Sequence, residues 1–240
     1  MNVKPDYGID APGVVRKLFL TGTSCLVAAL LFPRITITQV TLQLLPGLLC
    51  AAAAFLLSGG LMLLYSKVGK FHHRDRILTN VSWSGAESVL DVGTGRGLLL
   101  IGAARRLTTG HATGIDIWNA EDISNNGPEG LLKNREIERV IDKTTVKSED
   151  ARRMNFPDES FDVVLSNLCL HNIYNRSERA QACREIARVL KPGGIAVISD
   201  YKNMREYADQ LRKAGLEVRL GSPDYIRTYP PLRILEAKKV

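Results

Sequence analysis

The sequence contains few cysteines, and none of them is spaced as a metal-binding or redox pair. Cys25 and Cys50 lie in apolar stretches, whereas Cys169 and Cys183 lie apart from each other in the more polar remainder of the chain. This pattern excludes a disulfide-rich scaffold and a cysteine zinc site, and it predicts no bound metal. Each cysteine is expected to be a small buried residue in a reducing compartment.

Charged residues are absent from two long stretches near the amino terminus. No charge lies between Lys17 and Arg34, and none lies between Arg34 and Lys67. A helix needs about 20 apolar residues to cross a bilayer. Residues 42–65 meet this length easily, and residues 18–32 nearly reach it. The two stretches therefore predict a pair of transmembrane helices.

Positive residues flank this pair of stretches on both outer sides. Arg16 and Lys17 precede the first stretch, and basic side chains also follow the second one closely. Because positive flanks stay in the cytoplasm, we predict a multi-pass membrane protein whose main domain is cytoplasmic. The predicted parts are a cytoplasmic segment over residues 1–17, a transmembrane helical hairpin over 18–66 and a domain over 67–240. The basic residues after the second stretch are Lys67, Lys70, Arg74 and Arg76.

Two alternatives compete with a membrane hairpin. A cleaved signal peptide would require a small-residue cleavage site before the second stretch, and none stands out there. A soluble helical hairpin is disfavoured by the uncharged run over residues 35–65. Pro33, followed by the β-branched residues among 34–38, indicates a tight turn between the helices.

The remainder of the chain is only mildly basic. The whole chain has a formal net charge of +7, and its basic residues do not gather in one run. Nucleic acid is therefore not expected as a partner, and an anionic membrane surface fits the surplus equally well. The oligomeric state is left open.

From about residue 71 onward, strand and helix patterns alternate. Such alternation predicts an α/β domain with a Rossmann-like, doubly wound and mostly parallel sheet of seven strands. Ser177 is expected to cap the helix that begins there. The expected strands are 87–92, 111–117, 144–147, 161–166 and 195–199, with a final antiparallel pair, 216–220 and 234–237. The expected helices are 71–82, 97–107, 128–139, 177–190 and 204–214.

A glycine-rich turn follows the first strand of this domain. Gly93, Gly95 and Gly97 let the backbone approach a ligand closely, and the helix behind them offers free N–H groups. Alone, this turn suits a nicotinamide dinucleotide or a methyl donor. A dinucleotide motif places its third glycine one residue later, however. Asp91 before the turn also favours a cationic ligand, and Asp116 at the end of the next strand suits ribose hydroxyls.

With its neighbours, this turn resembles a known family. Residues 89–97 are similar to the first motif of class I S-adenosylmethionine methyltransferases, and 114–117 resemble the family's acidic ribose-binding position. Residues 149–151, with the run 156–162, resemble its adenine-side motif, and 190–194 resemble the turn before its fifth strand. The likeness is greatest to small-molecule enzymes such as ubiquinone/menaquinone C-methyltransferases. It covers roughly the chain from Val81 onward and leaves the hairpin outside.

The resemblance implies S-adenosyl-L-methionine as the cofactor. It implies that Asp150 bonds the adenine amino group and that Ala151 lies beside the ring. Trp118 is expected either to pack on the adenine or to belong to the core. The residues expected to bind the cofactor are Asp91, Gly93, Thr94, Gly95, Gly97, Asp116, Ile117, Asp150, Ala151 and Asn167.

The methyl acceptor is expected near the end of the fourth strand, where residues 166–172 follow. His171 is the candidate general base, because imidazole titrates near neutrality. Asn167 and Asn172 are candidates to orient a polar group of the acceptor. No Asn-Pro-Pro-Tyr or Asp-Pro-Pro-Tyr motif follows this strand, which disfavours amide or nucleobase methylation. Tyrosines are candidates to line the acceptor pocket, namely Tyr174, Tyr201 and Tyr229.

Together these features predict a methyltransferase that acts at a membrane surface on a small-molecule or lipid-like acceptor. A methyl donor bound beside a membrane favours an acceptor that resides in the membrane. Two alternatives remain at this stage. One is a non-catalytic, membrane-anchored sensor or adaptor that binds S-adenosylmethionine, and the other is a nicotinamide-dependent oxidoreductase.

Overall fold

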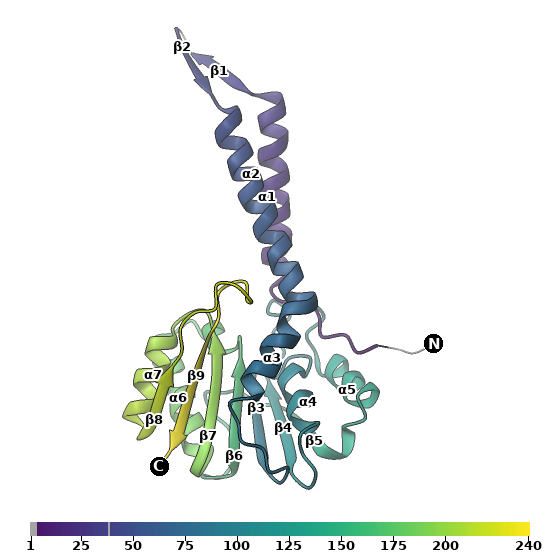
Figure 1. Cartoon of the computed structure of the whole chain (residues 1–240), viewed down its shortest axis with the longest axis vertical. Coiled ribbons are helices and arrows are strands. Elements are labelled where there is room, and N and C mark those ends of the chain that lie inside the picture. Colours follow the sequence, from purple (N-terminus) through teal and green to yellow (C-terminus); the bar gives the residue numbers. More distant parts are fainter. Residues whose placement is uncertain (1–3, 38) are drawn as a thin grey trace.

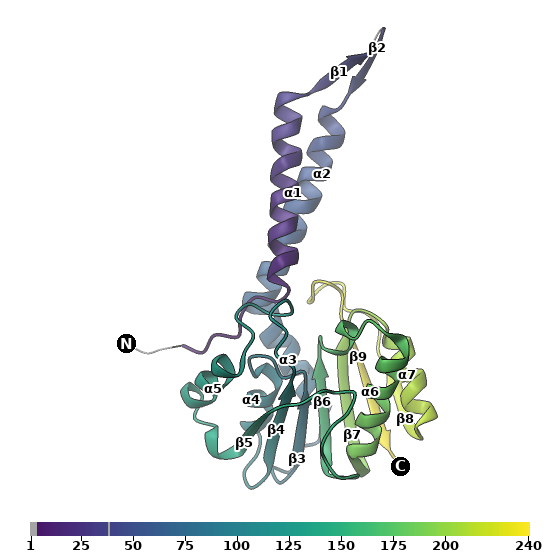
Figure 2. The ribbon, with the colours of Figure 1, turned by 180° about the vertical axis from the view of Figure 1, so that it is seen from behind.

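The computed structural model describes residues 4–37 and 39–240 and shows two parts (Figure 1). A pair of long helices stands on one edge of an α/β domain, and a short β-ribbon joins these helices at their far end (Figures 1 and 2). The carboxyl ends of the parallel strands point toward the base of the helix pair (Figure 1). Because ligands bind at those strand ends in such sheets, the helix pair begins beside the expected site.

The two helices are joined by an antiparallel ribbon instead of the predicted tight turn. Strands β1 and β2 pair from Arg34 opposite Gln43 to Ile37 opposite Val40. β-branched residues favour extended backbone, which is why this connection continues as strands. The elements of the hairpin are α1 (Pro12–Leu31), β1 (Arg34–Ile37), β2 (Val40–Gln43) and α2 (Leu45–Leu64).

Small residues allow α1 and α2 to pack closely. A Cβ atom added to Gly22 would lie 2.7 Å from Cγ of Leu56, and one added to Gly59 would lie 3.0 Å from the Phe19 ring. Glycines at helix contacts let two backbones approach, as they do between membrane helices. The pair is therefore held together along its length by direct side-chain packing.

Helix α2 continues into the α/β domain without a loop. A π-helical turn, η1 (Tyr65–Gly69), joins α2 to α3 (Lys70–Leu78). Together they form a helical span over Leu45–Leu78 that is 34 residues long. The predicted first helix of the domain therefore begins one residue before Phe71 and ends at Leu78. The orientation of the hairpin is fixed by a continuous helix that packs on the sheet.

Both helical spans are long and apolar enough to cross a membrane. In the most apolar stretch of each span, only a small share of the residues is buried within the protein. This share is 17% in Pro12–Leu31 and 11% in Leu45–Leu78. Core helices of a soluble domain bury most of their apolar side chains. These helices instead present their apolar side chains outward.

The sheet has seven strands in the order β5-β4-β3-β6-β7-β9-β8. Strands β3 to β7 are mutually parallel, whereas β9 is antiparallel to both β7 and β8. This confirms the predicted mostly parallel Rossmann-like sheet, with the last strand inserted inside the edge. The strands are β3 (Ser88–Val92), β4 (His111–Asp116), β5 (Thr144–Ser148), β6 (Phe161–Asn167), β7 (Leu190–Asp200), β8 (Leu216–Leu220) and β9 (Arg233–Lys239).

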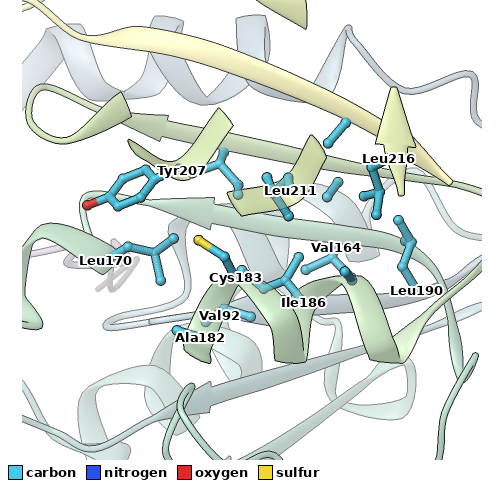
Figure 3. Close-up of a cluster of buried hydrophobic side chains, with 14 of the residues drawn as sticks. Val92, Val164, Leu170, Ala182, Cys183, Ile186, Leu190, Tyr207, Leu211 and Leu216 are labelled. Atoms are coloured by element: carbon cyan, nitrogen blue, oxygen red, sulfur yellow. The ribbon is translucent and has the colours of Figure 1, made fainter. Parts of the chain in front are cut away.

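Alternate residues of the central strands enter two cores on opposite faces. On β6, Val163 and Leu165 pack with α3 and α4, while Val164 packs with α6 and α7. Figure 3 shows the second core, in which Cys183 and Tyr207 face the sheet. Period-two alternation between two covered faces is what a doubly wound sheet requires. The helices are α4 (Leu98–Ala104), α5 (Pro128–Ile137), α6 (Arg176–Val189) and α7 (Met204–Lys213).

The predicted amino-terminal cap of α6 is wrong by two residues. The cap of α6 is Asn175 rather than Ser177, because the Asn175 side chain accepts a hydrogen bond from the Ser177 backbone N–H at 2.8 Å. The same oxygen also accepts the Ser177 hydroxyl at 2.7 Å. Asparagine and serine are both strong caps, so sequence alone does not choose between them.

Candidate active site

The glycine-rich turn is fixed by a buried carboxyl group. Asp91 is 1% exposed and accepts hydrogen bonds from the Thr94 hydroxyl at 2.7 Å and from the Leu100 N–H at 2.9 Å. These bonds tie the end of β3 to the turn and to the first turn of α4. Burial raises the pKa of Asp91 to about 7, although both hydrogen bonds act in the opposite direction.

The three glycines of the turn serve different purposes. A Cβ atom on Gly93 would lie 2.3 Å from Sγ of Cys169, and one on Gly97 would lie 2.1 Å from Leu131 Cδ1. Both glycines are therefore required by packing, and both have positive φ. At Gly95 the nearest atom to an added Cβ would be Asn126 Oδ1 at 4.0 Å. Gly95 thus leaves open space where a ligand can approach the backbone.

Asp116 lies at the carboxyl end of β4 and contacts this turn directly. Its carboxylate accepts hydrogen bonds from the Gly95 N–H and the Trp118 N–H, each at 2.7 Å. The neighbouring Ile117 is 64% exposed and lines the cavity described below. Trp118 instead packs on the core, and its indole N–H donates to Ser148. The structure therefore favours the core role of Trp118 over adenine packing.

Asp150 follows β5 and is held by an arginine that the sequence analysis did not single out. The Arg152 guanidinium donates to both Asp150 oxygens, from Nε at 2.9 Å, and it also pairs with Glu178. The Arg152 hydrogen bonds hold the pKa of Asp150 below its usual value, which keeps this carboxyl ionised. Ala151 lines the cavity beside it.

One large cavity joins these residues to the base of the helix pair. Its volume is about 1410 Å³. Pockets for single ligands usually measure about 300–1,000 Å³, so this one has room for a cofactor and a second molecule. Gly97, the last glycine of the turn, is not among the residues that line the cavity. The other nine predicted cofactor residues do line it: Asp91, Gly93, Thr94, Gly95, Asp116, Ile117, Asp150, Ala151 and Asn167.

The far half of the cavity is formed by the helix pair and the N-terminal segment. Arg16 and Lys17 of α1, Ser58 and Met62 of α2, and residues 229–231 of the β8–β9 connection line it. Nothing in the sequence patterns predicted that segments so far apart would share one wall. The Tyr174, Tyr201 and Tyr229 side chains, which were predicted to line an acceptor pocket, also belong to this cavity.

Segment 4–11 closes one side of the cavity. Lys70 is 3% exposed and its ammonium donates to the carbonyl oxygens of Tyr7 and Gly8, each at 2.7 Å. The same ammonium lies 3.6 Å from the Asp10 carboxylate. On the other side, Arg96 donates to the Asp6 carbonyl at 2.7 Å. The segment is therefore clamped to both the long helix and the α/β domain.

His171 lies in a short 3₁₀ turn, η3 (Leu170–Asn172), after β6. Its Nδ1 is 2.9 Å from one carboxylate oxygen of Asp200 and 3.1 Å from the other. Asp200 ends β7, is fully buried and also accepts the His171 and Tyr201 backbone N–H groups. A carboxylate on Nδ1 fixes the tautomer of the ring and leaves Nε2 as the basic nitrogen. No sequence motif points to Asp200, whose only signal is its place at the end of the fifth strand of the parallel sheet.

The chemistry of the lining fits a cationic cofactor. Asp91 and Asp116 hydrogen-bond residues of the turn, and Asp150 lines the same cavity. The side-chain amide oxygens of Asn126 and Asn167 have no hydrogen-bond partner among the described residues. Carboxylates and free carbonyl oxygens attract an ammonium, a sulfonium or hydroxyl groups, and they repel a pyrophosphate. The residues present therefore fit S-adenosylmethionine better than a nicotinamide dinucleotide.

Comparisons with known proteins agree with this geometry. Residues 90–198 match the protein family described as "Methyltransferase domain". Over this range, which holds the glycine-rich turn, Asp116, Asp150 and His171, the chain is similar to methyltransferase domains. Helices α1 and α2 lie outside the matched range.

The chain covers only part of the length of its sequence relatives, and it is similar to solved structures in fold alone. A ubiquinone/menaquinone biosynthesis C-methyltransferase from Geobacter sulfurreducens is 32% identical over 126 residues, which are 52% of this chain and 46% of that protein. The chain thus spans less than half of this relative. A SAM-dependent methyltransferase from Aquifex aeolicus has a TM-score of 0.58 at 19% identity, over 73% of this chain and 93% of that one.

A second solved structure shares the fold of the α/β domain. It is the geranyl diphosphate C-methyltransferase of Streptomyces coelicolor, solved with Mg²⁺, geranyl diphosphate and S-adenosyl-L-homocysteine. Its TM-score is 0.57 at 15% identity, over 70% of this chain and 80% of that one. Both structural likenesses show the Rossmann-like fold and no more.

Replacing Asp116 with alanine is expected to weaken S-adenosylmethionine binding by about 1–3 kcal/mol, the scale of lost hydrogen bonds to a charged group. The substitution also frees the Gly95 N–H, which loosens the turn. Calorimetric titration of the full chain measures the affinity. Asp142→Ala, at an exposed carboxylate before β5, is the matched control. Equal affinities for both variants and the wild type would remove Asp116 from the cofactor site.

Cofactor affinity is expected to rise with pH up to neutrality. The folded pKa of Asp91 is about 7, above the ordinary value of 3.8. In the cofactor-free protein, the protonated Asp91 carboxyl therefore contributes to the stability of the fold, and this stability is lost as pH rises through 7. A cationic cofactor instead favours the ionised carboxylate, so it binds better at the higher pH. Titrations should give binding about tenfold weaker at pH 6 than at pH 8. An equally steep dependence in Asp91→Asn would assign the effect to another group.

Proposed function

We propose that this chain transfers the methyl group of S-adenosylmethionine to a lipid-like acceptor at the surface of a membrane. The observation that carries this proposal is the continuous cavity. It runs from Gly95 at the cofactor turn to Arg16 and Ser58 at the base of the helix pair. An acceptor that resides in the bilayer could reach the methyl donor through that end of the cavity without crossing water.

The helix pair supports a membrane location. Leu20 and Leu30 of α1 and Leu57 of α2 are 61%, 71% and 64% exposed. Exposed apolar surface of this extent is unfavourable in water and favourable in the hydrocarbon of a bilayer. We propose that residues 18–66 span the membrane and that residues 1–17 and 67–240 lie in the cytoplasm, in keeping with the positive flanks.

The proposed chemistry needs little from the protein beyond alignment and one base. S-adenosylmethionine supplies a methyl group that its sulfonium already activates. His171 accepts a proton at Nε2 from an acceptor group that must lose one, and Asp200 holds the ring and stabilises the imidazolium. Asn167 and Asn172 line the same part of the cavity and can orient the acceptor. The N-terminal segment shields this space from water.

Transfer of a labelled methyl group tests the proposal. Membranes that contain the full chain are incubated with methyl-labelled S-adenosylmethionine, and their lipids are extracted. Label is expected in the lipid extract, and Asp116→Ala should lower it strongly. Label found only in water-soluble products would contradict a lipid-like acceptor. Cofactor binding with no labelled product in any fraction would instead indicate a sensor or adaptor.

A further inference from the structure

The connection between β8 and β9 forms a loop that rises beside the helix pair. This loop, residues 221–232, is here named the rim loop. In Figures 1 and 2 it extends past the carboxyl ends of the strands toward the base of α1 and α2. We propose that the tip of the rim loop inserts into the headgroup region of the bilayer, which places the mouth of the cavity in the membrane. This inference rests on the proposed membrane location.

The rim loop is rigidly built around one carboxylate. Asp224 accepts hydrogen bonds from the backbone N–H groups of Ile226 at 3.1 Å and Arg227 at 2.9 Å, and it pairs with Arg76 of α3. The buried Thr228 hydroxyl donates to the Asp224 carbonyl and accepts from the Leu232 backbone N–H, each at 2.8 Å. The side chains at the tip are therefore presented in a fixed arrangement.

The rim loop is also attached to the membrane helix itself. The Tyr229 hydroxyl donates to the Ser58 hydroxyl of α2 at 2.9 Å. A Cβ atom on Gly69 would lie 3.4 Å from the Arg227 carbonyl oxygen, so the loop backbone passes close to η1. Ser58 belongs to the stretch proposed to span the membrane. The loop must therefore lie at or near the depth at which α2 leaves the bilayer.

The tip presents side chains that suit a membrane interface. Ile226 is 94% exposed and Tyr225 is 76% exposed, and the exposed Arg227 follows them. Exposed apolar side chains on a rigid loop gain free energy only when another apolar phase covers them. Tyrosine and arginine are enriched where a protein meets lipid headgroups. Helix α2, to which the loop is bonded through Ser58, also exposes Leu57 and Leu64, so one bilayer can cover these side chains and the tip.

The rim loop also belongs to the cavity. Its residues Tyr229, Pro230 and Pro231 line the cavity on the side of the helix pair. If the tip lies among lipid headgroups, this side of the cavity opens toward lipid and not toward water. The rim loop would then guide an amphiphilic acceptor from the bilayer to His171 and the cofactor turn.

A tryptophan at the tip tests this placement. Full-length Ile226→Trp is reconstituted in vesicles of phosphatidylcholine and phosphatidylglycerol, with or without brominated acyl chains that quench tryptophan fluorescence. The control is Ile141→Trp, because Ile141 is 50% exposed and precedes the amino end of β5, at the far edge of the sheet. The wild-type signal of Trp83 and Trp118 is subtracted. Tyr225→Trp provides a second probe should Ile226→Trp fold poorly.

The added tryptophan at residue 226 is expected to be quenched at least about twofold more than the one at 141, with emission shifted to shorter wavelength. Equal quenching at both positions in protein that floats with the vesicles would overturn the rim-loop proposal and leave the membrane hairpin intact. Protein that does not float would overturn both. A shift to shorter wavelength without bromine quenching would show that a second copy or another protein covers the tip instead.

Discussion

Replacing His171 with alanine is expected to slow methyl transfer by about 10²–10⁴-fold, the usual contribution of a positioned general base. Affinity for S-adenosylmethionine should stay within a factor of about two, because His171 lies on the acceptor side of the turn. The buried Asp200 holds Nδ1, so Asp200→Asn should also slow transfer by favouring the wrong tautomer. The labelled-methyl assay measures both rates, and calorimetry measures the affinity.

The matched control for His171→Ala is His111→Ala. His111 is an exposed histidine at the start of β4, at the amino edge of the sheet, and its ring lies 2.8 Å from the Thr145 hydroxyl. Its removal should leave the rate unchanged. At saturating S-adenosylmethionine, a general base also gives a rate that rises with pH, and this rise should disappear in His171→Ala. A normal rate in that variant, or an unchanged pH profile, would reduce His171 to a structural role.

Replacing Lys70 with methionine is expected to destabilise the fold by about 3–5 kcal/mol, the cost of removing one partner of a buried ion pair. Burial lowers the pKa of Lys70 and raises that of Asp10, and the attraction between the two groups opposes both shifts. Without the ammonium, the carbonyl groups of Tyr7 and Gly8 lose their donor. The Asp10 carboxylate loses its charged partner and keeps the hydrogen bond from the Ser66 hydroxyl. Segment 4–11 should then separate from α3 around Tyr7 and Gly8, whereas Arg96 and Asn134 still hold it at Asp6.

Thermal unfolding in detergent and limited proteolysis of segment 4–11 measure this effect. Lys133→Met, at an exposed position of α5, is the matched control and should change neither readout. The double variant Lys70→Met with Asp10→Asn should recover part of the lost stability, because no buried charge is then left alone. Wild-type stability and protease resistance in Lys70→Met would show that the clamp does not hold the segment.

The elements of the α/β domain were predictable because their signals are local. Val89, Leu90 and Val92 alternate between the two cores, and a turn of glycines follows them at once. Such period-two patterns and turn residues lie within a few positions of each other. The sequence therefore predicted the seven strands and their mostly parallel arrangement. The order in which β9 lies inside β8 depends on pairing between distant segments, which no local pattern encodes.

Much of the candidate site could be predicted, but the residues that hold its side chains in place could not. The nine predicted cofactor residues that line the cavity stand at or just after the carboxyl ends of strands, where a parallel sheet gathers its ligands. Asp200 and Arg152 escaped notice because each acts through a partner that only the fold brings near. Gly97 was expected to contact the cofactor, yet its missing side chain makes room for Leu131.

The helical hairpin was also predictable in part. Its two apolar stretches were evident from the absence of charge between Lys17 and Arg34 and between Arg34 and Lys67. The unbroken passage of α2 into α3 was not, because Ser66 to Lys70 carries the charges that normally end a membrane helix. Lys67 is exposed, and the Lys70 ammonium is accommodated because it finds partners in segment 4–11. The sequence distance between them, more than sixty residues at Lys70 and Tyr7, hides the contact from pattern analysis.

The measurement that tests the account most directly is calorimetric titration of the full chain with S-adenosylmethionine and, separately, with NADH. We expect saturable binding of S-adenosylmethionine, weakened in Asp116→Ala, and no binding of NADH. The carboxyl groups of Asp91 and Asp116 at the turn should attract the sulfonium and repel the pyrophosphate. Binding of NADH in place of S-adenosylmethionine would contradict the assignment of the cavity and every proposal that rests on it.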